Sequence, residues 1–140
     1  MQGKKKKKRK TGINSKAKKK MAVARATIKK GTGKIKINNR GISVFQPAYL
    51  KRFIGEPLEM APAAKEVDIK VKVKGGGFMG QAAAARSAIA KALVQYSKDN
   101  KLRAAFLAYD RMLLVDDVRR VESKKPLGTK ARKKKQKSKR

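Results

Sequence analysis

The clearest pattern along the chain is a strict alternation of apolar and charged residues at positions 67–74, which read VDIKVKVK. Successive side chains of a strand point to opposite faces of a sheet, so this segment predicts a strand with one buried and one basic exposed face. Residues 21–29 and 34–38 also alternate, the first more loosely, with a glycine-containing turn at 30–33 between them. These two segments are predicted to form a β-hairpin.

Apolar residues at helical spacing predict three helices. A short one has Pro47 in its first turn and Gly55 at its end, and a longer one spans residues 81–97. Asp99 or Asn100 is suited to cap the third. The residues predicted to face the core on these helices are Leu50, Phe53, Ile54, Ala82, Ala85, Ile89, Leu93, Tyr96, Leu102, Phe106 and Tyr109.

The segment 112–122 is ambiguous, and a fourth strand is expected at 113–115 or at 119–122. Together the elements predict an α+β fold: a two-layer α/β sandwich whose mainly antiparallel, four-stranded sheet has helices on one face.

Charge divides the 140 residues into three parts. Residues 1–20 contain eleven Lys or Arg and residues 124–140 contain ten, with no acid in either segment. All nine acids lie in 21–123, and the whole chain has a formal net charge of +32. Blocks of like charge repel each other and bury little apolar surface. The sequence therefore predicts a disordered N-terminal tail (1–20), a globular RNA-binding domain (21–123) and an extended C-terminal tail (124–140).

Several classes of protein are excluded by composition. The chain has no His and no Cys, which removes Cys or His metal clusters, disulfides and His-based acid–base chemistry. No apolar run approaches the roughly 20 residues that span a bilayer, and MQGKKKKKRK is not the start of a signal peptide. We expect a cytoplasmic protein with no cofactor, no metal and no membrane or small-molecule partner.

Gly75, Gly77 and Gly80 form G-x-G-x-x-G between a predicted strand and a helix, as in dinucleotide-binding proteins. No acidic residue ends a second parallel strand about twenty residues later, and the chain is too short for a doubly wound sheet. A tight turn that offers backbone N–H groups to an RNA phosphate is the better interpretation.

Carboxylates occur as the near pairs Glu56 with Glu59 and Asp116 with Asp117, each among many Lys and Arg. No nucleophile stands beside a plausible base, so these acids are predicted to form structural salt links and the chain is predicted not to be an enzyme.

The large excess of positive charge favours RNA as the partner, because basic side chains displace counterions from phosphates. Most aromatic residues fit apolar helix faces, with Phe78 in the glycine turn as the possible exception, so recognition should rest on phosphates and shape. The candidate RNA-binding residues are Lys36, Lys70, Lys72, Lys74, Gly75, Gly76, Gly77, Arg86, Arg119, Arg120, Lys124, Lys125, Lys130, Arg132, Lys133, Lys134, Lys135 and Lys137.

Short segments resemble the ribosomal protein S9 family of the small subunit, in an archaeal-type form closer to its archaeal–eukaryotic branch than to the bacterial one. They are 67–77 with Gly80-Gln81, 84–86, 90–93, Tyr109-Asp110-Arg111, 116–120, 122–125 and 136–140. The resemblance covers about residues 20–140, and the first twenty residues depart from the family.

The resemblance implies a fold like domain 2 of ribosomal protein S5, with a left-handed β-α-β crossover that breaks the usual rule. It also implies a place in the head of the small subunit, bound to small-subunit ribosomal RNA beside other ribosomal proteins. In the family the last basic residues reach the tRNA in the peptidyl site, which here would be Ser138, Lys139 and Arg140.

Two other functions remain open on the residues alone. A general, chromatin-like nucleic-acid-binding protein would bind DNA and RNA comparably and would not associate with ribosomes. An enzyme that uses the glycine turn would bind a nucleotide cofactor saturably.

Overall fold

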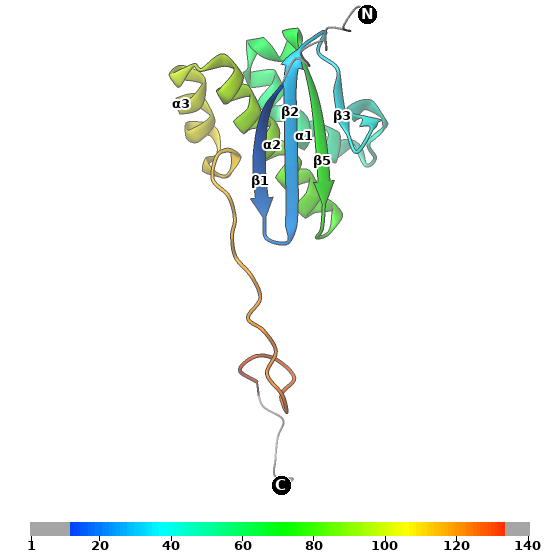
Figure 1. The fold of residues 1–140 in the computed structure, drawn as a ribbon, viewed down its shortest axis with the longest axis vertical. Helices are drawn as coiled ribbons and strands as arrows, with labels where there is room; N and C mark the ends of the chain where they lie inside the picture. The colour runs from blue at the N-terminus through cyan, green and yellow to red at the C-terminus, as the bar shows by residue number, and fades with distance from the viewer. Residues whose placement is uncertain (1–11, 134–140) are drawn as a thin grey trace, which may run out of the picture.

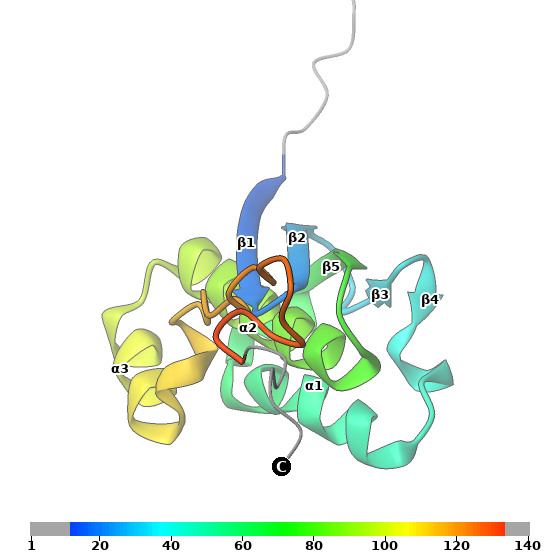
Figure 2. The same ribbon diagram turned by 90° about the horizontal axis from the view of Figure 1, so that it is seen from below.

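Five strands form one mixed sheet in the computed structural model, which describes residues 12–133. The strands are β1 (Ile13–Lys19), β2 (Ala22–Lys30), β3 (Ile35–Ile37), β4 (Arg40–Gly41) and β5 (Val67–Lys74). Their order across the sheet is β1-β2-β5-β3-β4, in which only β3 and β5 run parallel. Three α-helices, α1 (Ala48–Met60), α2 (Phe78–Ser97) and α3 (Asn100–Tyr109), lie behind the sheet in Figure 1, and Figure 2 shows the same separation into two layers.

The sheet corrects the predicted fold in two respects. It has five strands instead of four: three of the predicted strands form, and two others are added, β4 and β1, the latter from residues 13–19, predicted as part of a tail, which pair along β2. The predicted hairpin of residues 21–29 with 34–38 is wrong, because β5 lies between β2 and β3. The hairpins that form join β1 to β2 and β3 to β4.

Residues 113–115 and 119–122 do not form the expected fourth strand. Leu113 ends a short 3-10 helix (Arg111–Leu113) in which its side chain is fully buried, and residues 119–122 are exposed and extended. The exposed stretch meets no strand in the described chain, and only Asp117, before it, makes an isolated bridge to Lys19.

The connection from β3 through α1 to β5 is left-handed. In Figure 1 β5 runs downward, β3 is parallel to it on its right, and α1 crosses behind the sheet. The view from below agrees that α1 lies on the helical side. The crossover expected from the resemblance is therefore present.

The alternation in β5 is as predicted. Val67, Ile69, Val71 and Val73 are buried, and the three lysines that alternate with them, Lys70, Lys72 and Lys74, are exposed. In β2 the residues Ala22, Ala24, Ala26 and Ile28 are buried in the same way. The core thus lies between the sheet and the helices, and the other sheet face is open.

Helix α2 packs centrally, because small residues line most of its circumference. Its buried residues include Ala82, Ala85, Ile89 and Leu93, as predicted, and further alanines on the other sides. A helix buried nearly all round needs such residues, since alanine lets sheet and neighbouring helices approach closely. Ser15 of β1 donates to the Ala88 carbonyl at 2.7 Å and fastens the helix to the sheet edge.

The other two helices differ from prediction in detail. Helix α1 does not stop at Gly55 but continues through Pro57 to Met60, and Pro47 precedes it as the N-cap. Helix α3 is capped by Asp99, whose side chain accepts from the Lys101 N–H, and buries Leu102 and Phe106 as predicted. Tyr109 is 57% exposed, so its predicted place in the core is wrong.

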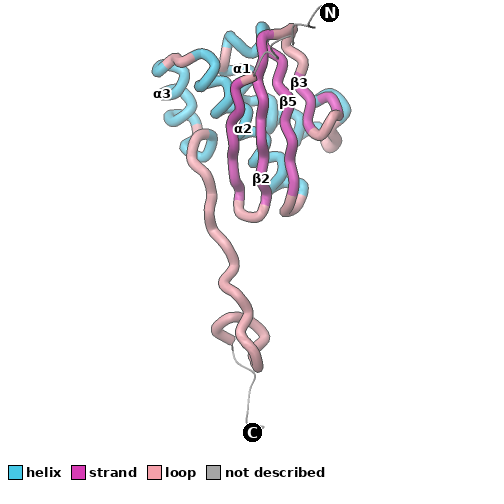
Figure 3. Tube along the Cα trace, in the orientation of Figure 1, coloured by secondary structure: helices cyan, strands magenta, loops and turns pink. Residues whose placement is uncertain are grey.

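Beyond residue 117 the chain leaves the domain as an arm, residues 118–133, whose extended first part is followed by a loop in which the Thr129 N–H donates to the Lys133 carbonyl at 3.0 Å (Figure 3). This arm includes the start of the predicted C-terminal tail, and its residues 118–127 are exposed.

Candidate nucleic-acid interface

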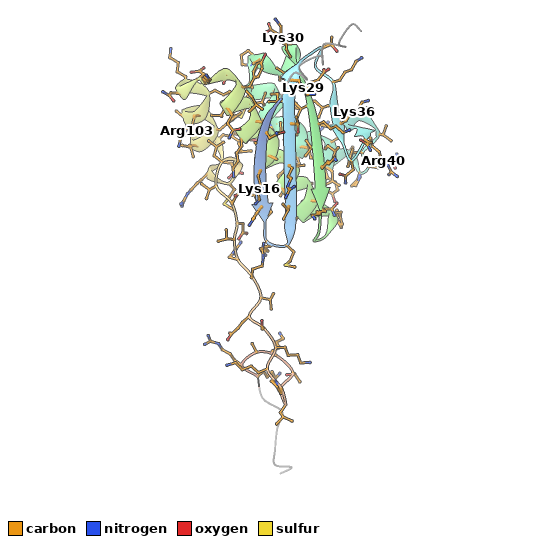
Figure 4. All side chains as sticks on the ribbon, in the orientation of Figure 1. Lys16, Lys29, Lys30, Lys36, Arg40 and Arg103 are labelled. Carbon is orange, nitrogen blue, oxygen red and sulfur yellow. The ribbon has the colours of Figure 1, made fainter. Side chains whose placement is uncertain are left out.

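The open face of the sheet is basic across four strands. Strand pairing aligns its outward residues in rows: Lys16, Arg25 and Lys72 form one row across β1, β2 and β5. Lys36 and Lys70 are aligned in another. The complete set of basic residues on this face, which we call the basic sheet face, is Lys16, Lys18, Arg25, Lys29, Lys36, Lys70, Lys72 and Lys74. Figure 4 shows Lys16, Lys29 and Lys36 at three of its strands.

These charges have no acidic partners in the fold. Among residues 12–133, none of the basic sheet face takes part in an ion pair. Asp68 is the acid on this face, and its carboxylate accepts hydrogen bonds from the Thr32 and Lys34 N–H groups, each at 2.9 Å. Those hydrogen bonds hold the pKa of Asp68 below its usual value. Like charges directly opposite each other destabilise a sheet, so this arrangement suits a face that meets a polyanion.

Two shallow depressions on this face share Arg25 and Lys72. In one of them, Thr27 Oγ1 donates to Asn14 Oδ1 at 2.7 Å. Uncharged hydrogen-bonding groups thus lie among the cations, a mixture that suits phosphate and ribose oxygens together.

The glycine turn after β5 has a steric explanation. Gly75 and Gly76 have φ values of +78° and +67°, and a Cβ on Gly75 would lie 2.6 Å from the Met21 carbonyl oxygen. The turn therefore packs against the β1–β2 hairpin. Helix α2 begins immediately after Gly77, with no side-chain cap and no acid in its first turn. Phe78 is 66% exposed, as expected from its place in the glycine turn.

Arg86 is not available to RNA, which corrects its place among the candidate residues. Its side chain is 9% exposed and forms ion pairs with Glu56 and with Asp110, the latter at 2.7 Å. Its guanidinium also lies 4.5 Å from the centre of the Phe53 ring. Arg86 therefore joins α1, α2 and the end of α3 inside the helical layer.

We predict that Arg86→Met lowers the free energy of unfolding by about 2 kcal/mol, because two carboxylates lose their shared cation. This is less than for a fully buried pair, since Glu56 and Asp110 side chains are 29% and 30% exposed. Partial burial acts to raise the pKa of Asp110. The hydrogen bonds that its carboxylate accepts from the Met112 N–H and from Arg86 nevertheless hold this pKa below its usual value. The stabilising effect of the ionised Asp110 is fully present above the pKa that this carboxyl has in the unfolded chain. It is lost as pH falls through the lower pKa of the folded state.

The difference between Arg86→Met and the unmodified chain should therefore shrink as pH falls below about 4. Urea denaturation at several pH values measures it. Arg103→Met, at an exposed position of α3, is the matched control and should have little effect. A difference that is independent of pH would contradict the role given to the carboxylates.

The arm carries the remaining candidates. Arg119 makes a two-point contact with Asp117, at 2.9 and 2.7 Å, which lowers the pKa of that carboxyl. Arg132 pairs with Glu122 at 2.9 Å. The other described arm candidates are exposed: Arg120, Lys124, Lys125, Lys130 and Lys133. Lys134, Lys135, Lys137, Ser138, Lys139 and Arg140 lie outside the described residues.

Four cations of the basic sheet face were not predicted from the sequence: Lys16, Lys18, Arg25 and Lys29. The first two fell in the supposed tail, where their alternation with Ser15 and Ala17 was masked by the surrounding lysines. Arg25 and Lys29 could have been found, because they alternate with the apolar residues of a predicted strand.

Three of the four paired acids form structural links, as predicted, whereas Glu59 is exposed and forms no ion pair among the described residues. Glu56 pairs with Arg86, Asp116 with Lys91 and Asp117 with Arg119. Residues 12–133 contain no group of three potential metal ligands among Asp and Glu. Nor does any helix in that range have the length and apolar character to cross a membrane.

Comparison with known proteins places this chain in the class of ribosomal proteins. The chain belongs to the family described as Ribosomal protein S9/S16, whose match covers residues 17–140. The resemblance is confirmed, and so is the prediction that the chain is not an enzyme.

The chain is similar along most of its length to archaeal relatives called small ribosomal subunit protein uS9. That of Picrophilus torridus is 49% identical over 122 residues, 86% of this chain and 92% of the relative. That of Methanothrix thermoacetophila is 47% identical over 127 residues, 90% and 96% of the two chains. That of Thermoplasma volcanium is 50% identical over 122 residues, again 86% and 92%. The predicted archaeal-type form is confirmed.

Proposed function

We propose that the chain is a structural protein of the small ribosomal subunit, where the basic sheet face and the arm bind small-subunit ribosomal RNA. The observation that carries the RNA contact is the set of aligned cations that no acid of the described fold neutralises. Family membership and the small-subunit relatives support the location. The left-handed crossover supports the S5-domain-2-like fold.

The proposed contacts follow the accessible cations. They comprise the basic sheet face, the N–H groups of the Gly75–Gly77 turn and α2 N-terminus, and the arm residues Arg119, Arg120, Lys124, Lys125, Lys130, Arg132 and Lys133. Neighbouring proteins of the subunit head are further partners implied by the family.

Sedimentation of cell lysate through sucrose gradients tests the location. The chain should migrate with small subunits and stay with them through a high-salt wash. Comparable binding of the purified chain to DNA and RNA, with loss from subunits in the wash, would instead favour a general nucleic-acid-binding protein.

We also propose that the end of the tail contacts the tRNA in the peptidyl site, through Ser138, Lys139 and Arg140. The family resemblance supplies this target. The arm supports it, because it leads away from the domain (Figure 1), and about a dozen residues span roughly 40 Å when extended. A guanidinium offers a planar pair of donors to phosphate, and an ammonium acts as a point charge.

Removing residues 138–140 should leave subunit assembly nearly intact and speed tRNA dissociation from the peptidyl site. Arg140→Lys should keep part of the contact, and Arg140→Glu should be worse than deletion because it repels the RNA backbone. Dissociation from purified subunits carrying each tail is the measurement. Equal rates across the series at low salt would contradict the contact and leave the tail as an arm that only neutralises ribosomal RNA.

A further inference from the structure

The point where the arm leaves the domain is held by polar contacts. Leu113 is the last fully buried apolar residue before the arm, and Val118 and Val121 are 71% and 96% exposed. Between them, Asp117 is largely buried although it carries a charge. Hydrophobic packing therefore does not fix the direction of the chain after residue 115.

Backbone bonds attach this point to the edge of the sheet. The Asp117 N–H donates to the Lys18 carbonyl at 3.0 Å, and the Lys20 N–H donates to the Asp117 carbonyl at 2.9 Å. The arm thus begins as a single parallel bridge on the outer edge of β1. One bridge leaves the chain free to rotate unless side chains restrain it.

Side chains supply that restraint. Asp116 Oδ1 accepts from Lys91 Nζ of α2 at 2.6 Å and from the Lys18 N–H of β1 at 3.1 Å. Lys19 Nζ donates to the Met112 carbonyl at 2.7 Å. One carboxylate therefore connects the helical layer, the sheet edge and the chain that leaves them.

The local charges favour this geometry. Partial burial works against the charged form of Asp116, but the hydrogen bonds from Lys91 and Lys18 nevertheless keep its pKa below the usual value. The chain has only nine acids among 140 residues, and two of them are adjacent here. Elsewhere on so basic a molecule the lysine-rich arm is repelled, so an attractive contact at its root decides where it points.

We propose that Lys91, Asp116 and the Lys18 backbone form a clamp that sets the exit direction of the C-terminal arm, with Lys91 and Asp116 as positioning residues. This rests on the proposed function of the arm in reaching RNA. The first part of the arm, residues 118–125, contains no turn and spans up to roughly 27 Å when extended, so a change of about 20° at the root moves its far end by about 9 Å.

The clamp can be tested on the free full-length chain in high salt. The chain has no cysteine, so nitroxide labels can be attached at Gln95→Cys on α2 and Ser123→Cys on the arm, both exposed positions. Pulsed electron resonance then measures their distance distribution. Asp116→Ala and Lys91→Met should each at least double its width, and the double variant should add little to either.

Two controls separate positioning from folding. Glu122→Gln removes one negative charge, as Asp116→Ala does, but in the arm beyond the clamp, and should leave the distribution unchanged. Labels at Gln95→Cys and Lys30→Cys, both within the domain, should report the same distance in every variant. Broadening of this internal pair by Asp116→Ala would overturn the proposal by making Asp116 a general stability residue.

An unchanged arm distribution in Asp116→Ala and Lys91→Met, or equal broadening by Glu122→Gln, would also overturn it. These outcomes are independent of whether the tail contacts tRNA, since no RNA is present. Conversely, if the label distances establish the clamp, a negative result in the tRNA measurement does not affect that conclusion.

Discussion

Val71→Asp is expected to unfold the domain, with a loss of about 4 kcal/mol or more of unfolding free energy. Val71 is fully buried in the middle of β5, between its sheet partners Ala26 and Ile37. A carboxylate at this position would lie beside these apolar side chains, and burying an unpaired charge costs several kcal/mol. Since small domains have only about 5–15 kcal/mol of stability, most of the population should lose its fold.

Circular dichroism during urea denaturation, in high salt to limit repulsion between the cations, measures this loss. The matched control is Lys72→Ala at the next position, which is exposed and should alter stability little. Because a shift of one residue exchanges the two faces of a strand, the opposite result would mean that the register of β5 is off by one.

Local patterns predicted those elements whose own residues decide their structure. Strand β5 alternates strictly and has the predicted bounds, and α3 has its cap and its two buried residues. In each case a single face is buried, so the sequence period reports the burial directly. Helix α2 starts at Phe78, three residues before the predicted position, since the glycine turn is followed at once by helix.

The errors come from interactions between distant segments. Residues 34–38 lie after a turn from β2, which favoured a hairpin, but β5 inserts between the two strands because β2 pairs with it along eight residues. Asn38 then completes β3 against β5 in a way that no periodicity reveals: its side chain exchanges hydrogen bonds of 3.0 and 2.9 Å with the Val73 backbone.

Burial explains the other misassignments. Strand β1 contains four lysines counting its neighbour Lys20, and it is held in place by two small residues, Ser15 and Ala17, that fit against α2. Small residues give a weak hydrophobic signal although they permit close packing. Helix α1 continues past Gly55 because its far turn packs through Pro57, which is fully buried.

The candidate interface was predictable where it depends on one strand. The alternation of β5 predicts Lys70, Lys72 and Lys74, and the alternation of the neighbouring strand β3 predicts Lys36. Arg86 could not be assigned from sequence, because its partners Glu56 and Asp110 come from other helices. Acids within the fold pair with neighbouring groups that hold the structure together. The cations of the sheet face therefore remain available to an external polyanion.

Arg25→Glu is expected to weaken RNA binding strongly while slightly stabilising the free chain. Arg25 lies between Lys16 and Lys72 in the row across three strands. Adjacent strands are about 4.8 Å apart, so three like charges repel one another in the absence of RNA. A glutamate between the two lysines replaces this repulsion by two cross-strand attractions, each worth about 0.2–1 kcal/mol.

In the complex with RNA the same substitution is expected to be unfavourable instead of stabilising. It removes a guanidinium from the middle of the row and presents a carboxylate to the phosphates. We expect about 10- to 100-fold weaker binding at about 0.1 M salt, and a salt dependence whose slope is smaller by about one unit because one cation no longer meets a phosphate.

Titration of a small-subunit ribosomal RNA fragment from the head, over a series of salt concentrations, measures the affinity, and thermal unfolding of the free chain measures stability. Arg103→Glu on α3 makes the same charge change on the helical layer, away from the sheet face (Figure 4), and should reduce affinity far less. If the two variants weakened binding equally, only the net charge of the chain would matter. The aligned cations of the sheet would then have no particular role in RNA binding, whereas opposite changes in stability and affinity at Arg25 are the result that a preformed phosphate-binding row requires.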